Sequence, residues 1–315
     1  MLSSEMPQVT VAVVVRDRRE RMMRCLEAIL AQDHPSFEVV VIDNCSTDGT
    51  AEAVKERGAT APVAVTVVIE PGSVGHLRNV ATRLANGEIL AFTDSDCAPA
   101  PGWLAAGEAA LHRDRRVGIV QGRTLPDNDD LGAWPNTQQI TEPNLYFECC
   151  NIFYRLDALR ASDGFDETTR LSAFGEDTAA GWSVMRQGWR RSFEPSALVH
   201  HDVTYPGLVW HLRRALRYEA FPALVRQYPE MRDHFFWHRW FLSRRYAAFF
   251  GAVVGILLAL RWRPTLLLAL PYAWWRRPAA PGWRFIRGQF EGTLYDAAGF
   301  TGLVRGSIRH RRVVL

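Results

Sequence analysis

Two aspartates separated by one serine follow an apolar run in the first third of the chain. The run covers residues 88–93, and Asp94, Ser95 and Asp96 come directly after it. In an extended chain, residues i and i+2 point to the same side, so we expect both carboxylates to face one point. Converging carboxylates repel each other unless a cation lies between them, and Mg²⁺ and similar hard ions take oxygen ligands. The sequence predicts a divalent-metal site here, with an acidic turn that merely ends a strand as the plainer alternative.

A second acidic pair, Glu176 and Asp177, precedes a stretch with helical character at 179–187. A carboxylate at the N-terminus of a helix is held ionised and oriented by backbone N–H groups. A group placed in this way could remove the proton of an attacking hydroxyl. The alternative is an ordinary acidic first turn of a helix.

The elements that must position these acids form a repeated strand–helix unit. We predict strands at 9–15, 37–43, 63–69 and 88–93, with helices at 18–31, after Thr50 and at 76–85. This alternation predicts an α/β fold with a doubly wound, mostly parallel sheet. Ligands bind at the carboxyl ends of such strands, where the sequence places Asp17, Asp43, Asp94 and Asp96. Neither a P-loop nor a G-x-G-x-x-G motif occurs.

An ordered series of segments resembles the family 2 glycosyltransferases of the GT-A fold. The segments are residues 39–50, Gly75-His76-Leu77-Arg78-Asn79 and Thr93-Asp94-Ser95-Asp96, and with later matches the resemblance covers about residues 9–205. It implies a nucleotide-sugar donor.

In the donor half, each predicted role follows from the resemblance. Asp43 would bind the base or ribose, and Arg78 would lie near the diphosphate or base. Asp94 would lie near the ribose and sugar, with Ser95 beside it, and Asp17 aligns with a polar donor-loop position. The metal, Mg²⁺ or Mn²⁺, would be held mainly by Asp96, with Asp94 and His201.

In the acceptor half, the resemblance assigns Asn151 and the Gly164-Phe165-Asp166 turn to the acceptor pocket. It makes Asp177 the general base, with Glu176 beside it as part of the catalytic pair. Asn151 could equally be a hydrogen-bonding residue at a strand end.

The chain departs from the family pattern at two places. Val14-Val15 ends the first strand where the family commonly has a proline and a small polar residue. Ala179 and Ser183 stand where the family often has an aspartate and an arginine. These departures leave open a non-catalytic nucleotide-sugar-binding protein. An aspartyl-phosphatase of the Asp-x-Asp type is disfavoured by Cys97 and by the absence of a convincing downstream lysine.

Charge divides the chain sharply. Residues 1–204 carry 19 basic and 29 acidic side chains, whereas residues 205–315 carry 18 arginines, 5 acids and seven of the eleven tryptophans. We predict a GT-A catalytic domain at 1–204, with a donor half at 8–124 and an acceptor half at 125–204. A basic, aromatic helical region follows at 205–315 and suits an anionic surface.

Two uncharged runs in this second region, 246–260 and 264–275, are shorter than the ~20 residues that span a bilayer. They predict a helical hairpin dipped into one leaflet, and we expect a membrane rather than a nucleic acid as partner. The alternative is a soluble helical subdomain that buries these faces or uses them to dimerise.

Five scattered cysteines fit a reducing compartment. The whole reading is an inverting, metal-dependent glycosyltransferase on the cytoplasmic membrane face, with a lipid-linked or cell-envelope acceptor.

Overall fold

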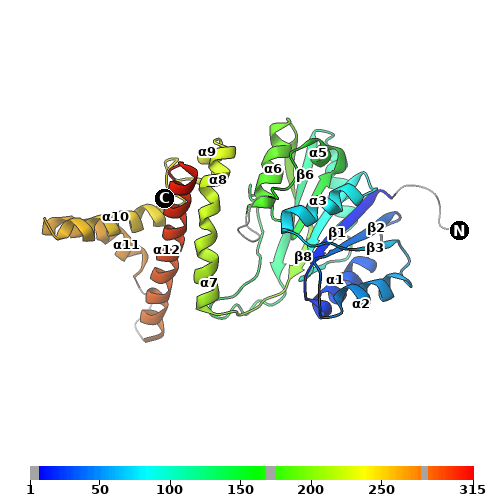
Figure 1. Ribbon diagram of the computed structural model, residues 1–315, viewed down its shortest axis with the longest axis horizontal. Helices are drawn as coiled ribbons and strands as arrows, with labels where there is room; N and C mark the ends of the chain where they lie inside the picture. The colour runs from blue at the N-terminus through cyan, green and yellow to red at the C-terminus, as the bar shows by residue number, and fades with distance from the viewer. Residues whose placement is uncertain (1–6, 168–174, 278–282) are drawn as a thin grey trace. The chain divides into compact units, whose positions relative to one another are not determined.

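The computed structural model describes residues 7–167, 175–277 and 283–315. The chain divides into two compact units, Met1–Thr204 and Tyr205–Leu315, which we call the first and second unit. Figure 1 shows a sheet with flanking helices in the first unit and helices in the second. Each unit is described by itself.

The first unit is built on an eight-stranded sheet of order β3-β2-β1-β4-β7-β6-β8-β5. Its strands are β1 Val9–Val15, β2 Phe37–Asp43, β3 Val65–Ile69, β4 Ile89–Asp94, β5 Cys97–Pro99, β6 Val117–Pro126, β7 Asn151–Arg155 and β8 Arg190–His201. The first four strands pair in parallel. In the other half, β7 is antiparallel to β4 and β6, β8 is parallel to β6, and β5 is antiparallel to β8. The predicted α/β sheet is confirmed, with a mixed rather than parallel second half.

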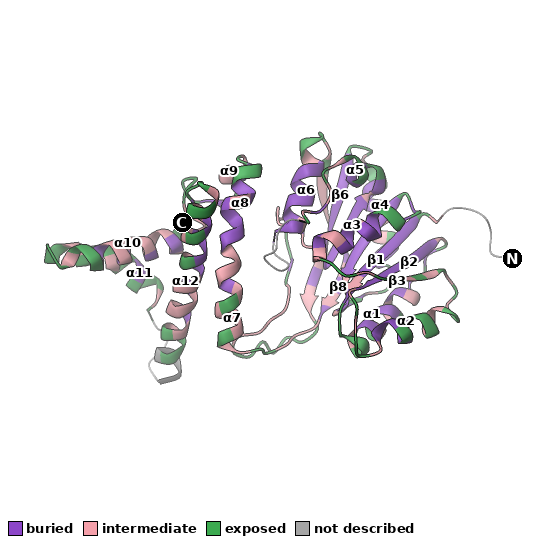
Figure 2. Cartoon of the chain, in the orientation of Figure 1, coloured by how far each residue is buried: buried purple, intermediate pink, exposed green. Residues whose placement is uncertain are grey.

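Six helices of the first unit fall within the described residues. They are α1 Arg19–Leu30, α2 Thr50–Gly58, α3 Val74–Leu84, α4 Trp103–Arg113, α5 Leu156–Ala161 and α6 Glu176–Arg186. Figure 2 shows strands such as β1 and β2 as largely buried, whereas β3 at the edge of the sheet is partly exposed. Helix α1 buries Met22, Cys25, Leu26 and Ile29, the face that its apolar spacing predicts. The branched side chains of β1 and β2 are buried almost throughout, as a strand covered on both faces requires.

Some element boundaries differ from the sequence prediction. Strand β3 begins at Val65 rather than residue 63. Helix α3 begins two residues earlier than predicted, because the Ser73 hydroxyl accepts a hydrogen bond from the His76 N–H and caps it. The short strand β5 was not predicted, since three residues carry too little periodicity to be recognised.

The second unit contains only helices as regular elements within its described residues, as predicted, and they are joined by loops and an isolated β-bridge between Trp237 and Phe241. Its elements are α7 Leu208–Ala215, the 3₁₀ turn η1 Leu216–Glu219, α8 Ala220–Gln227, α9 Met231–Phe235, α10 Arg244–Ala259, the 3₁₀ segment η2 Arg263–Ala269, α11 Leu270–Trp275 and α12 Trp283–His310. Across the described ranges of the chain, no helix has the length and apolar character needed to cross a bilayer.

Candidate active site

The loops that follow β1 and β2 are tied together by hydrogen bonds. Asp17, in the left-handed backbone region with φ 49°, accepts at Oδ1 from the Thr47 N–H at 2.7 Å. The Ser46 hydroxyl accepts from the Asp17 N–H at 2.8 Å. Asp17 therefore shapes this edge of the sheet through its own hydrogen bonds to the neighbouring loop.

Asp43 ends β2 and is completely buried. Its Oδ1 accepts from the Ser46 N–H at 2.7 Å, but its buried Oδ2 has no hydrogen-bond partner among the described residues. A buried carboxylate oxygen left without a donor is costly, so this atom is available to accept a hydrogen bond from a bound ligand or an ordered water. An N–H of a base or an O–H of a ribose has the required chemistry.

The acids at the end of β4 do not share one extended strand. Asp94 is the last residue of β4, while Ser95 and Asp96 form a turn before β5. The extended-strand premise of the i, i+2 argument is therefore wrong, although the Asp96 carboxylate lies close enough to raise the pKa of Asp94. Asp94 faces Arg78, whose Nη2 lies 3.5 Å from its Oδ1, and Asp96 faces other groups. Ser95 is buried in the turn.

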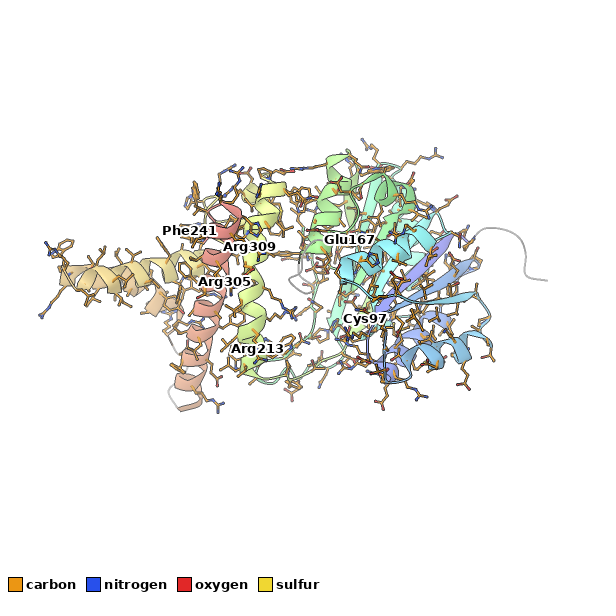
Figure 3. All side chains as sticks on the ribbon, in the orientation of Figure 1. Cys97, Glu167, Arg213, Phe241, Arg305 and Arg309 are labelled. Carbon is orange, nitrogen blue, oxygen red and sulfur yellow. The ribbon has the colours of Figure 1, made fainter. Side chains whose placement is uncertain are left out.

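Asp96 lies among groups that could bind a metal. Its Oδ1 is 3.7 Å from Nε2 of His201, and the Cys97 thiol completes a set whose possible ligand atoms lie within 4.8 Å of one another. Cys97, labelled in Figure 3, is buried, and burial raises the pKa of its thiol well above the ordinary value. A protonated thiol is a poor ligand for Mg²⁺ or Mn²⁺. Asp96 and His201 are therefore the two residues of this set whose chemistry suits Mg²⁺ or Mn²⁺.

The hydrogen bonding of His201 favours a role as ligand. Its Nδ1 lies 2.8 Å from the carbonyl oxygen of Asp202, and a carbonyl can only accept, so Nδ1 carries the proton. In the neutral ring, Nε2 then presents a lone pair toward the Asp96 carboxylate. Two electron-rich groups facing each other require a cation or a proton between them, which is the arrangement found where histidine binds metals.

Arginines of α1 and the residue before it surround this site, and the sequence prediction missed them. Arg18 donates to Oδ2 of Asp96 at 2.6 Å. Arg21 and Arg24 both pair with Asp202, at 3.2 and 2.6 Å. Arg21 and Arg24 are three residues apart and therefore lie on one face of α1. The sequence signal that could have identified these arginines is a row of basic residues in an otherwise acidic domain.

Arg78 connects the donor half to the acceptor half. It is buried on α3, donates through Nη1 to Oε1 of Glu176 at 2.8 Å, and lies over the ring of Phe165 at 5.7 Å. Glu176 is buried as well. The pKa of Asp94 is raised, since the cost of removing its charge from water outweighs the attraction of Arg78, and the charge of Asp96 adds to the rise.

Asp177, the predicted general base on the acceptor side, directly follows Glu176 in the chain. Its Oδ1 accepts from the Thr178 N–H at 2.8 Å in the first turn of α6, which is the backbone hydrogen bond that the sequence predicted, but burial outweighs this bond and the predicted stabilisation of the ionised form is wrong. Burial, followed by the charge of Glu176, raises the pKa of the Asp177 carboxyl well above its ordinary value. Glu176 points to Arg78 instead, so its predicted place in a catalytic pair is corrected to that of a residue that positions Arg78.

Asn151 does not form part of an acceptor pocket. It is fully buried, and its Nδ2 donates to the carbonyls of Arg123 and Ala197 at 2.8 and 2.9 Å. Its Oδ1 accepts from the indole N–H of Trp103 at 2.9 Å. Every polar atom of this side chain is occupied in joining β6, β7, β8 and α4. The strand-end alternative raised from the sequence is the one that these contacts support.

The Gly164-Phe165-Asp166 turn is held against α3. Asn79 donates to the Phe165 carbonyl at 2.8 Å and accepts from the Phe165 N–H at 2.9 Å. Gly75 permits this close approach, because a Cβ there would lie 2.3 Å from the Asp166 carbonyl oxygen. Asp166 thereby stands beside α3, and residues 168–174 lie outside the described structure.

One departure from the family pattern has a structural explanation. The Ser183 hydroxyl accepts from the Asp163 N–H at 2.9 Å, so Ser183 holds the start of the same turn. Ala179 is buried, in a helix that packs closely enough for a Cβ at Gly181 to meet the Phe147 ring at 2.2 Å.

Comparison with known proteins agrees with this geometry. The model of Glycosyl transferase family 2 matches residues 10–166. Glycosyltransferase AglE of Haloferax volcanii is 35% identical over 114 residues, which are 35% of this chain and 37% of the relative. The pre-mycofactocin glycosyltransferase of Mycobacterium tuberculosis is 28% identical over 239 residues, 70% of this chain and 48% of the relative. The chain thus spans about half or less of the length of these two relatives.

A solved structure matches nearly the whole chain. The mannosyltransferase PcManGT from Pyrobaculum calidifontis, in complex with GDP-Man and Mn²⁺, superposes with a TM-score of 0.62 and 25% identity. The match covers 96% of this chain and 88% of that one. The mixed sheet with flanking helices is therefore the GT-A fold.

Proposed function

The chain belongs to glycosyl transferase family 2, and from this premise we propose that it transfers a sugar from a nucleoside-diphosphate sugar to an acceptor hydroxyl with inversion. The observation that carries the proposal is the Arg78 bridge. Through its contacts with Asp94 and Glu176, Arg78 connects the donor-side acid at the end of β4 to the residue that precedes Asp177. A single displacement requires a donor bound on one side of the reacting carbon and a base on the acceptor side.

Donor binding is assigned to the carboxyl ends of β1, β2 and β4. The unpartnered Oδ2 of Asp43 would accept from the base or ribose. Arg78 and Asp94 would lie along the diphosphate and sugar, with Asp17 shaping the loop above them. PcManGT binds GDP-Man on the same fold, which supports a nucleotide-sugar donor without fixing its base or sugar.

A divalent cation fits the pair Asp96 and His201. The carboxylate oxygen and the imidazole Nε2 are donors that Mn²⁺ accepts readily and Mg²⁺ accepts with water in the remaining positions. Bound there, the cation would neutralise charge that develops on the diphosphate leaving group. Arg18 places a positive charge on the other carboxylate oxygen of Asp96, Oδ2, at 2.6 Å.

The chemical step needs one base. Asp177 takes the proton of the acceptor hydroxyl as its oxygen forms a bond to the anomeric carbon. The bond from that carbon to the diphosphate oxygen breaks, and the electron pair leaves with the diphosphate. Attack opposite the leaving group inverts the anomeric configuration. The guanidinium of Arg78, whose Nη2 lies 3.5 Å from Oδ1 of Asp94, would stabilise negative charge on the donor side.

The acceptor is proposed to be a lipid-linked or cell-envelope glycan at the cytoplasmic face of the membrane. The support is the composition of the second unit, with 18 arginines against 5 acids and seven tryptophans. A basic, aromatic region suits an anionic membrane surface.

A donor panel tests the proposal. Purified protein is incubated with individual nucleotide sugars, with Mn²⁺, with Mg²⁺ or with a chelator, and release of nucleoside diphosphate is measured. We expect release with one donor class and only with metal. Donor binding without release in the presence of candidate acceptors would instead indicate the non-catalytic nucleotide-sugar-binding protein.

A further inference from the structure

Helix α10 and the segment η2–α11 form a tight hairpin in the second unit, and Figure 1 shows them side by side. The Thr265 hydroxyl donates to the carbonyls of Gly255 and Trp262 at 2.9 and 2.8 Å. A Cβ at Gly255 would lie 2.5 Å from the Thr265 carbonyl oxygen, so the two arms approach more closely than any larger residue allows. The hairpin is thus a preformed element.

The base of the hairpin is firmly packed. Phe249, Ala252 and Tyr272 form a small core together with apolar residues of α12. Asp296 of α12 is buried and pairs with Arg245 and Arg276 from the two arms, and it also accepts from the Tyr272 hydroxyl at 2.8 Å. These contacts anchor both arms to α12 at one end.

Residues 256–275 run from the last turn of α10 round the bend of the hairpin and back along η2 and α11, and they expose many large apolar side chains, a surface that we call the apolar tip. It holds eleven of the twenty-one large apolar side chains that are exposed in the described residues. They are Ile256, Leu257, Leu258, Leu260, Trp262, Leu266, Leu267, Leu268, Leu270, Trp274 and Trp275. Leu260 is 93% exposed, and Figure 2 shows the free end of α10 as exposed. A patch of this size on a folded element marks an interaction surface.

Positive charge accompanies this surface without any negative charge. Residues 244–277 contain six arginines and no acid. Arg261, Arg263 and Arg277 are exposed, and within the described ranges none of the three has a carboxylate partner. Arg277 lies over the Trp274 ring at 3.6 Å. Tryptophan and arginine at the border of an apolar surface suit the headgroup region of a bilayer, where the ring is half buried and the charge meets lipid phosphates.

We propose that the apolar tip docks into one leaflet of an anionic lipid bilayer and lies in its interface. Helix α10 has 16 residues, about 24 Å at the rise of an α-helix, which is short of the ~30 Å hydrocarbon core. A second copy of the chain fits this surface less well. A two-fold interface would bring the same unpaired arginines of both copies together without an acid to neutralise them.

Vesicle sedimentation with the full-length chain tests the docking without reference to activity. The chain should sediment with phosphatidylglycerol-containing vesicles and much less with phosphatidylcholine vesicles. The double variant Leu260→Asp/Leu267→Asp should lower the partition coefficient by tenfold or more, since each buried leucine is worth about a tenfold change. Leu84→Asp, at an exposed leucine of the first unit, is the matched control and should bind like the wild type.

The arginines are tested separately from the apolar side chains. Changing Arg261, Arg263 and Arg277 to glutamine should weaken binding to anionic vesicles about fivefold per arginine at low salt, and should hardly affect zwitterionic vesicles. High salt should weaken the wild type without releasing it completely, because the apolar contact does not depend on screening.

A fluorescent probe attached to the apolar tip shows whether the tip enters the apolar part of the bilayer. Among the five cysteines, Cys45 is exposed and the other four are buried, so a Cys45→Ser background permits labelling at Leu260→Cys. The fluorophore should move to an apolar environment on anionic vesicles. Complete release by salt, unchanged binding of the Leu260→Asp/Leu267→Asp variant, or a concentration-dependent dimer that this variant abolishes would each overturn the proposal.

Discussion

Arg78 donates a 2.8 Å hydrogen bond to Glu176, and both side chains are buried although 98 positions separate them in the chain. This pair fixes the start of α6 relative to α3. Asp177 follows immediately, so the placement of the proposed base depends on a contact made by the preceding residue. Arg78 also reaches Asp94, and one guanidinium therefore joins the two acidic motifs of the sequence.

Glu176→Gln should separate positioning from proton transfer. The glutamine keeps the shape but removes the charge that holds Arg78, which can then shift toward Asp94. We expect a clear rise in donor KM and a smaller fall in kcat, measured by steady-state kinetics. Loss of kcat alone, with donor KM unchanged, would show that Glu176 acts in the chemical step instead.

Asp177→Asn should remove the base while keeping donor binding. General base catalysis contributes about 10²–10⁴-fold, and kcat should fall by that order. Donor affinity, measured by calorimetry in the presence of Mn²⁺, should stay close to that of the wild type. If donor binding is lost as well, Asp177 belongs to the donor site.

The pH dependence of kcat should follow Asp177. Its pKa is raised by burial and next by the charge of Glu176, and the base works only when ionised, so kcat should fall as pH decreases through that raised pKa. Glu148 also raises the pKa of Asp177. Glu148→Gln should therefore move the acidic limb of the profile to lower pH, whereas Asp114→Asn, a change at the partly exposed carboxylate that follows α4, should leave it in place.

Asp96→Asn should abolish metal-dependent turnover, because the neutral amide cannot replace the carboxylate opposite His201. Mn²⁺ binding, followed by calorimetry or by water-proton relaxation, should weaken in parallel. His201→Gln should weaken the metal less, since one ligand remains charged. Wild-type activity of Asp96→Asn at ordinary metal concentration would remove Asp96 from the metal site.

The sequence allowed much of the fold to be predicted, because its signals are local. Apolar runs such as β2 and helical spacing such as that of α1 report burial directly. The position of Asp43 at a strand end and of Asp177 at a helix start follows from the same periodicity. The acidic first unit and basic second unit were visible from composition alone.

What the sequence could not show are the partners that distant residues choose. Arg78 could pair with several acids, and its choice of Glu176 depends on how α3 and α6 pack. The turn at Ser95–Asp96 is set by β5, which is too short to recognise. The sequence around Asn151 is compatible both with ligand binding and with hydrogen bonds to three buried groups. The packing of the surrounding strands determines which of these roles it has.

The structural role of Asn151 gives the last prediction. Asn151→Ala removes a hydrogen-bond partner from the Trp103 N–H and from the carbonyls of Arg123 and Ala197 in the interior. Each unsatisfied buried group costs about 1–3 kcal/mol, so the free energy of unfolding should fall by at least about 3 kcal/mol. Gly122→Ala should have a similar effect, because its Cβ would lie 2.3 Å from Oδ1 of Asn151 and 2.4 Å from the Ala197 carbonyl oxygen.

Chemical denaturation measures the free energy of unfolding of both variants. Acceptor KM, determined at a temperature where each variant is folded, should match the wild type. A raised acceptor KM in a variant of undiminished stability would return Asn151 to the acceptor site.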